Sequence, residues 1–66
     1  MTGREKYVAA KASVKATYAE AEKERLRGVA CSNHGDGQGA RKFFASAKHL
    51  RADARMIENK IARGAL

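Results

Sequence analysis

The chain has no proline, no tryptophan and one cysteine, and it has half as many acidic as basic residues. The absence of proline permits long helices, because proline is the residue that breaks them most strongly. A single cysteine excludes an intramolecular disulfide, which domains this small often need. No long uninterrupted apolar run occurs, which excludes a transmembrane helix and the apolar core of a secretory signal.

Sixty-six residues suffice for one compact domain, residues 1–66, with no second domain beside it. Fourteen of the hydrophobic residues are alanines, which leaves fourteen large apolar or aromatic side chains and Cys31 to build a core. So small a core holds an isolated monomer only marginally. We therefore expect a homodimer, such as an antiparallel four-helix bundle, or a subunit that docks on a larger partner.

Helix formers dominate the N-terminal half of the chain. Thr2 and Glu5 have the spacing of a capping box, in which each side chain bonds the other residue's backbone amide. This predicts a helix over about 3–27, with Gly28 as its left-handed C-terminal cap. Its last turn would then carry three cations that suit the negative end of the helix dipole, namely Lys23, Arg25 and Arg27.

The composition changes over residues 28–40, where three glycines alternate with polar residues. This pattern predicts a glycine-rich loop. Helix formers resume over about 41–63 and end at Gly64. The expected fold class is all-α, an antiparallel two-helix hairpin.

The apolar residues of the second predicted helix follow steps of three and four, which predicts one packing seam: Phe43, Ala47, Leu50, Ala54, Ile57 and Ile61. The first helix carries two apolar stripes, one with Tyr7, Ala10, Val14, Tyr18 and Ala21, the other with Val8, Ala12, Ala19 and Leu26. A hairpin needs one seam, so the second stripe is a candidate partner interface. The alternative is that both stripes merge into one alanine-rich face.

Phe44 follows Phe43 but points about 100° away from it on a helix. Three roles are open to its ring: stacking on an unpaired base, packing on a partner protein, or packing within the hairpin. We group it with Val8 and Leu26 as the candidate partner interface.

Basic residues concentrate on the second predicted helix, which has a net charge of +5 against +3 for the first. Arg41, Lys48 and Arg55 recur every seven residues opposite the seam, with Arg51 beside them. Such a stripe suits contact with phosphates of a nucleic acid. The alternative is a solvated face that keeps the protein soluble.

Nothing in the chain predicts catalysis, a metal or a cofactor. Cys31 and His34 have a ligand-like spacing, but zinc needs four ligands and the only other histidine is His49. The glycines before the second helix lack the spacing of a nucleotide-binding loop, and Asp36 among them would repel phosphate or cap that helix. We expect no enzymatic activity and interpret this segment as a flexible connector.

A short helical hairpin that opens with Met1, Thr2, Glu5 and Lys6 resembles the Rop family of plasmid copy-number regulators. The resemblance implies that two hairpins form a bundle and that RNA is a ligand. The long glycine loop and the basic charge depart from that family, and no functional residue is carried over. The small, basic, alanine-rich chain is also similar to accessory proteins of bacteriophages.

The favoured hypothesis is a non-catalytic accessory protein that binds the backbone of DNA or RNA through Arg41, Lys48, Arg51 and Arg55. The alternative is a protein-interaction module, either an assembly subunit of a phage particle or an inhibitor of a larger enzyme. In that case Val8, Leu26 and Phe44 would form the interface and the positive charge would match an acidic protein surface. We expect the protein in the cytoplasm, or within a virion, and not in a membrane.

Overall fold

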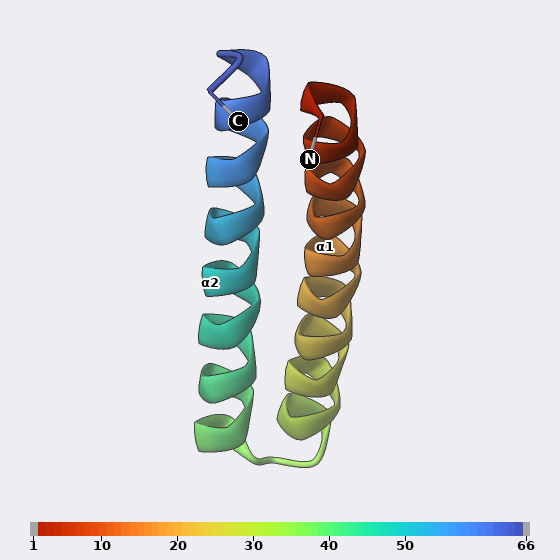
Figure 1. The fold of residues 1–66 in the computed structure, drawn as a ribbon. Helices are drawn as coiled ribbons and strands as arrows, with labels where there is room; N and C mark the ends of the chain where they lie inside the picture. The colour runs from red at the N-terminus through yellow and green to blue at the C-terminus, as the bar shows by residue number, and fades with distance from the viewer. Residues whose placement is uncertain (1, 66) are drawn as a thin grey trace.

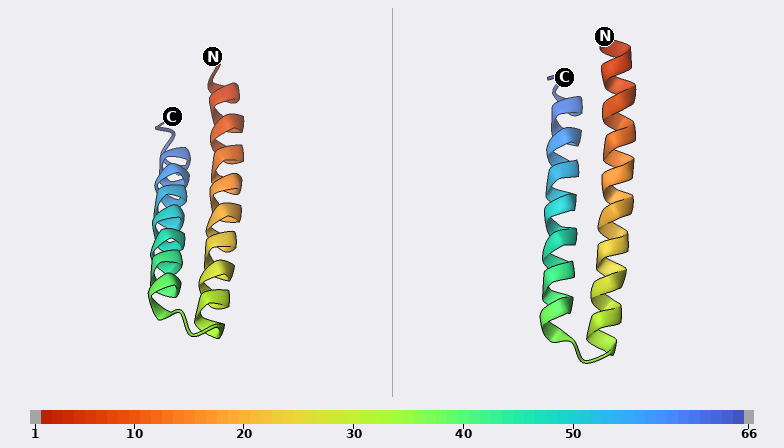
Figure 2. Two further views of the ribbon diagram at one scale, coloured as in Figure 1. Left: turned by 90° about the horizontal axis from the view of Figure 1, so that it is seen from below. Right: turned by 60° about the horizontal axis from the view of Figure 1, so that its bottom comes forward.

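The computed structural model describes residues 2–65 and shows two antiparallel α-helices joined by a short turn (Figure 1). Helix α1 spans Gly3–Asn33 and α2 spans Gly37–Ala62. The first described turn of α1 and the last of α2 lie at the same end, and further views show the helices side by side (Figure 2). The hairpin measures 49 × 15 × 14 Å, so it is a narrow rod. The predicted all-α hairpin is confirmed.

The outer ends of both helices form as the sequence predicts. The Thr2 hydroxyl accepts a hydrogen bond from the Glu5 amide, and the Thr2 amide donates to the Glu5 carboxylate, both at 3.2 Å. At the C-terminus of α2, Gly64 has a φ of +66°, which glycine adopts without the steric cost of a side chain. The amide of Ala65 reaches back to the Lys60 carbonyl at 2.8 Å, which closes a Schellman cap.

The prediction that α1 ends at Gly28 is wrong. Gly28 is buried inside the helix, where a Cβ atom would lie 2.7 Å from Cε1 of Phe44. The glycine therefore makes room for an aromatic ring from α2, and the helix continues for five more residues. As a consequence Lys23, Arg25 and Arg27 do not lie in the last turn, which among the described residues carries no cation.

The true turn occupies residues 34–36, so the predicted loop over 28–40 is also wrong. Gly35, with a φ of +79°, ends α1, and the Asp36 amide bonds the Cys31 carbonyl at 2.8 Å. The Asp36 carboxylate then caps α2 by accepting from the Gly39 amide at 2.9 Å. A Cβ on Gly39 would collide with that carboxylate. Helix α2 therefore starts four residues earlier than predicted.

The seam between the helices combines small residues of α1 with larger ones of α2. On α2 the predicted stripe is confirmed: Ala47 and Ala54 are buried, and the four larger side chains are half-buried. Tyr7 and Tyr18 of the predicted α1 stripe instead lie at its exposed edge. The α1 side of the seam keeps the heptad spacing of a left-handed coiled coil through Ala10, Val14, Thr17, Ala21, Glu24, Gly28 and Cys31.

Candidate nucleic-acid interface

The four predicted phosphate-binding residues, Arg41, Lys48, Arg51 and Arg55, are all exposed on α2, and we call them the basic surface. Arg41, Lys48 and Arg55 are seven residues apart, so they share one side of α2 at intervals of about 10 Å. Arg51 lies between this row and α1, close enough to affect the titration of Glu22. Among residues 2–65, none of the four forms an ion pair within 4.0 Å.

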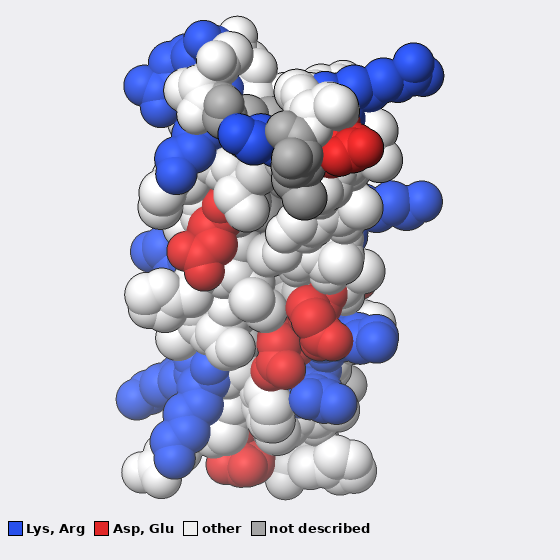
Figure 3. All heavy atoms as spheres, viewed as in Figure 1, with Lys and Arg blue, Asp and Glu red and all other residues white. Residues whose placement is uncertain are grey.

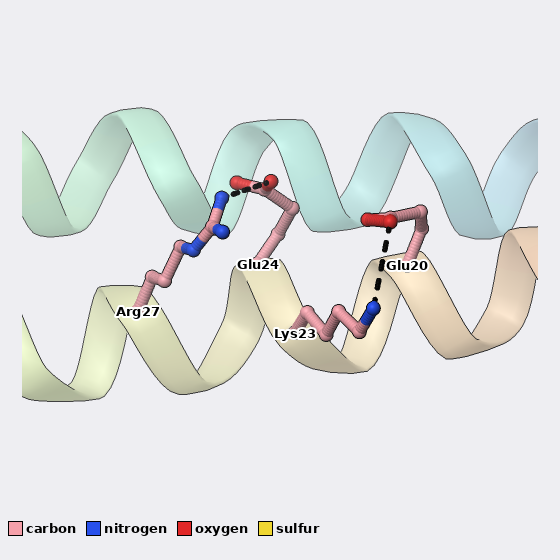
Figure 4. Close-up of polar contacts among 4 residues, drawn as sticks. All are labelled: Glu20, Lys23, Glu24 and Arg27. Atoms are coloured by element: carbon pink, nitrogen blue, oxygen red, sulfur yellow. Dashed lines mark hydrogen bonds and ion pairs between the residues drawn. The ribbon is translucent and has the colours of Figure 1, made fainter.

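Unlike the basic surface, the three cations of α1 that follow its acidic residues form ion pairs. Three successive ion pairs link Glu20 to Lys23 at 3.9 Å, Glu22 to Arg25, and Glu24 to Arg27 at 3.2 Å. Figure 4 shows the first and third of them, with both carboxylates directed toward α2. In the space-filling view acidic side chains lie near the middle of this face, over α2 and near both ends of the hairpin, while most basic ones project from its edges (Figure 3). Helix α1 is thus partly self-neutralised, whereas the basic surface is not.

The acidic residues nearest the basic surface already have partners. The Tyr18 hydroxyl donates a hydrogen bond to the Glu58 carboxylate across the two helices. This bond, followed by desolvation and the charge of Glu58, raises the pKa of Tyr18, while nearby Arg55 opposes the shift. The bond from Arg25 lowers the pKa of Glu22, against a smaller effect of desolvation, and the charges of Arg25 and Arg51 lower it further. Both carboxylates are therefore already engaged by a neighbouring side chain.

The structure adds cations from α1 that the sequence-based interpretation missed. Lys11 lies with Glu58 around a shallow hollow between the helices, and its ammonium is 5.7 Å from the Tyr7 ring centroid. Arg25 lies beside Glu22 on the same edge, next to Arg51. The sequence signal was available, because steps of three and four place one row on this edge: Lys11, Lys15, Tyr18, Glu22 and Arg25.

The three candidate partner-interface residues do not share one surface. Val8 and Leu26 are 59% and 53% exposed on the side of α1 that faces away from α2. Phe44 is 41% exposed at the edge of the hairpin, with its ring against Gly28. Among the three roles considered for Phe44, this contact favours packing within the hairpin. Val8 and Leu26 remain exposed and far from the basic surface.

The Asp36 carboxylate accepts from the Gly39 amide at the start of α2 and would repel a phosphate there, so the turn is a poor phosphate cradle. Nor do three His, Cys, Asp or Glu side chains gather as metal ligands anywhere in residues 2–65. Cys31 is half-buried near the turn, whereas His34 is exposed as the C-terminal cap of α1. Neither described helix is long and apolar enough to cross a bilayer.

Comparison of the chain with protein-family models, with curated proteins and with solved structures gave no significant match.

Proposed function

We propose that the protein is a non-catalytic accessory protein that binds the phosphate backbone of nucleic acid through the basic surface of α2. One observation carries this proposal: Arg41, Lys48, Arg51 and Arg55 are exposed and form no ion pair within residues 2–65, whereas α1 pairs three of its seven cations with its own carboxylates. The four side chains of the basic surface are therefore available to contact phosphates.

The geometry supports recognition of the backbone rather than of a base sequence. Arginine and lysine neutralise phosphates and release counterions, which makes affinity fall with salt. Four contacts to a duplex predict a slope of roughly −3.6 for the logarithm of the binding constant against the logarithm of the salt concentration. Base-specific recognition needs side chains that reach base edges in a groove. The basic surface is a row of cations with no side-chain set at base-reading spacing on an evident recognition helix, so we expect low sequence specificity.

The test is a titration of a short DNA duplex and an RNA hairpin at several salt concentrations. Replacing Arg41, Lys48, Arg51 and Arg55 by alanine should weaken binding and flatten the slope by about three units or more. A charge-matched control removes four other exposed cations, Lys6, Arg27, Lys42 and Lys60. The control should retain most of the slope.

Two results contradict the proposal. If both quadruple variants lose the same slope, binding reflects net charge and not this surface. If the unmodified protein binds neither nucleic acid at low salt, the protein-interaction module becomes the favoured hypothesis.

A further inference from the structure

All three exposed aromatic side chains among residues 2–65 lie on the edge of the hairpin that carries the basic surface. Tyr7, Tyr18 and Phe44 are 45%, 36% and 41% exposed. Phe44 is three residues after Arg41 and four before Lys48, so the helical period places it within the basic surface. The tyrosines belong to the edge of α1 beside it. We call the whole surface the tyrosine edge, which comprises the basic surface with Phe44 and, on α1, Tyr7, Lys11, Lys15, Tyr18, Glu22 and Arg25.

Each tyrosine has a cation beside it. The Lys11 ammonium is 5.7 Å from the centroid of the Tyr7 ring, and Arg55 lies near enough to Tyr18 to affect its titration. The Tyr18 hydroxyl also donates a hydrogen bond to Glu58 across the two helices, which fixes the position of the ring. Tyr18 follows Tyr7 by eleven residues, so the two ring–cation pairs are about 16 Å apart along α1.

We propose that the tyrosine edge binds an unpaired nucleic-acid strand, with bases stacked on Tyr7 and Tyr18 and phosphates bound by the adjacent cations. This ligand rests on the proposed function and narrows it to single strands. A row of cations alone suits a duplex equally well, but stacking on an aromatic ring needs a base whose face is free, and neighbouring base pairs cover both faces in a duplex. Because the Phe44 ring packs against Gly28, we assign the stacking to the two tyrosines. Neither kind of contact involves the sugar, so strands of DNA and RNA fit alike.

The opposite edge of the hairpin lacks this combination of rings and cations. There the carboxylates of Glu20 and Glu24 are directed toward α2 (Figure 4), and within residues 2–65 no exposed aromatic side chain accompanies them.

The charge of the tyrosine edge agrees with a phosphate backbone as its ligand. Its two nearest carboxylates, Glu22 and Glu58, each accept a hydrogen bond from a neighbouring side chain. The cations outnumber them: Lys11, Lys15, Arg25, Arg41, Lys48, Arg51 and Arg55. A strand that lies along this edge therefore meets an excess of positive charge on both sides of each tyrosine ring.

The first experiment compares an oligothymidylate of about 15 nucleotides with the duplex that it forms with oligoadenylate. The affinity for a duplex falls more steeply with salt, and stacking on the rings is open only to the single strand. At about 200 mM salt the single strand should therefore bind about tenfold more tightly or more. The chain has no tryptophan, so its fluorescence comes from Tyr7 and Tyr18. Stacked bases should quench this fluorescence, whereas the duplex should leave it unchanged.

The second experiment separates the rings from their hydroxyls. Tyr7→Leu combined with Tyr18→Leu removes both rings and should weaken binding of the single strand by about tenfold or more, while the affinity for the duplex stays the same. Tyr7→Phe combined with Tyr18→Phe is the matched control, because it also breaks the bond with Glu58 but keeps both rings. The control should retain most of the affinity for the single strand. Circular dichroism should show the helical content of the unmodified chain in both double variants.

The outcomes distinguish this ligand from the proposed function. Equal affinity for single strand and duplex without quenching would overturn the assignment to unpaired strands, and so would a Tyr7→Leu, Tyr18→Leu protein that binds the single strand as tightly as the control. Binding of the duplex through the basic surface would in either case still support the proposed function. An unmodified chain that binds neither nucleic acid would overturn both.

Discussion

At the scale of single residues, three glycines with different structural roles explain where the helices begin, continue and end. Gly35 supplies a positive φ, Gly39 leaves space for the capping carboxylate of Asp36, and Gly28 leaves space for an aromatic ring. From the sequence alone, all three glycines are interpreted as helix breakers. Only the neighbour of each glycine, a backbone turn, a carboxylate or a ring, distinguishes them.

A second residue-scale feature, the bond between Tyr18 and Glu58, has a measurable effect on pH dependence. The raised pKa of Tyr18 means that its contribution to stability is complete below the unfolded value of 10.0 and is lost as pH rises through the folded value. In a Tyr7→Phe background, where Tyr18 is the only tyrosine, ultraviolet titration should give a midpoint above 10.0.

Adding Glu58→Gln to that background should lower the midpoint, because the charged acceptor of the hydrogen bond is gone. Glu20→Gln is the control, since Glu20 pairs with Lys23 and does not contact Tyr18. An unchanged midpoint in the Glu58→Gln protein would show that the bond is absent in solution.

At the scale of the helices, the two sides of the seam contribute unequally. Helix α2 supplies the large side chains at regular heptad positions, which is why its seam could be predicted from the sequence. Helix α1 supplies small and polar residues, including Thr17, Glu24 and Cys31, so its hydrophobic pattern is weak. The sequence-based prediction placed Tyr7 and Tyr18 in the seam because their stripe is the more apolar one. In the structure both rings lie at the exposed edge of the seam.

The contact of Phe44 with Gly28 couples the two helices and can be measured by a double-mutant cycle. Alanine is favoured over glycine inside a helix by about 1 kcal/mol, but a Cβ at Gly28 displaces the Phe44 ring. Gly28→Ala should therefore stabilise a Phe44→Ala protein by about 1 kcal/mol and stabilise the unmodified chain less, or not at all. Urea unfolding at one protein concentration gives the four free energies. Equal effects of Gly28→Ala in both backgrounds would contradict the packing described.

At the scale of the whole molecule, electrostatic repulsion acts along a narrow rod. The net charge is +7 on a body about 15 Å across, and the screening length falls from about 30 Å at 10 mM salt to about 10 Å at 100 mM. At low salt every charge therefore interacts with charges on both helices. Two of the three ion pairs are exposed, and the third joins half-buried Glu24 to exposed Arg27, so the three contribute little against this repulsion.

Raising NaCl from 10 mM to 100 mM should consequently raise the melting temperature, by about 4 °C or more for each 1 kcal/mol of relieved repulsion. Circular dichroism melts at constant protein concentration measure the change. Replacing Arg41, Lys48 and Arg55 by glutamine should raise the melting temperature at 10 mM and reduce its dependence on salt. A melting temperature that falls as salt is added would show that the ion pairs outweigh the repulsion.

The amino-acid sequence by itself determined the features that depend on local chemistry. The Thr2–Glu5 capping box, the stop at Gly64, the seam of α2, the all-α hairpin and the basic character of α2 all follow from neighbours within one or two turns. Backbone hydrogen bonding and helical period act over such short distances, so no knowledge of the opposite helix is needed.

The tertiary structure alone decided the features that depend on the opposite helix. Helix α1 continues past Gly28, because this glycine makes room for the Phe44 ring of α2 and does not end the helix. The tertiary structure also reduced the turn to residues 34–36, directed Glu24 and Thr17 into the seam in place of the tyrosines, and brought Lys11 and Arg25 to the edge beside the basic surface. These outcomes join residues far apart in sequence, and helical period alone does not specify which positions of two helices meet.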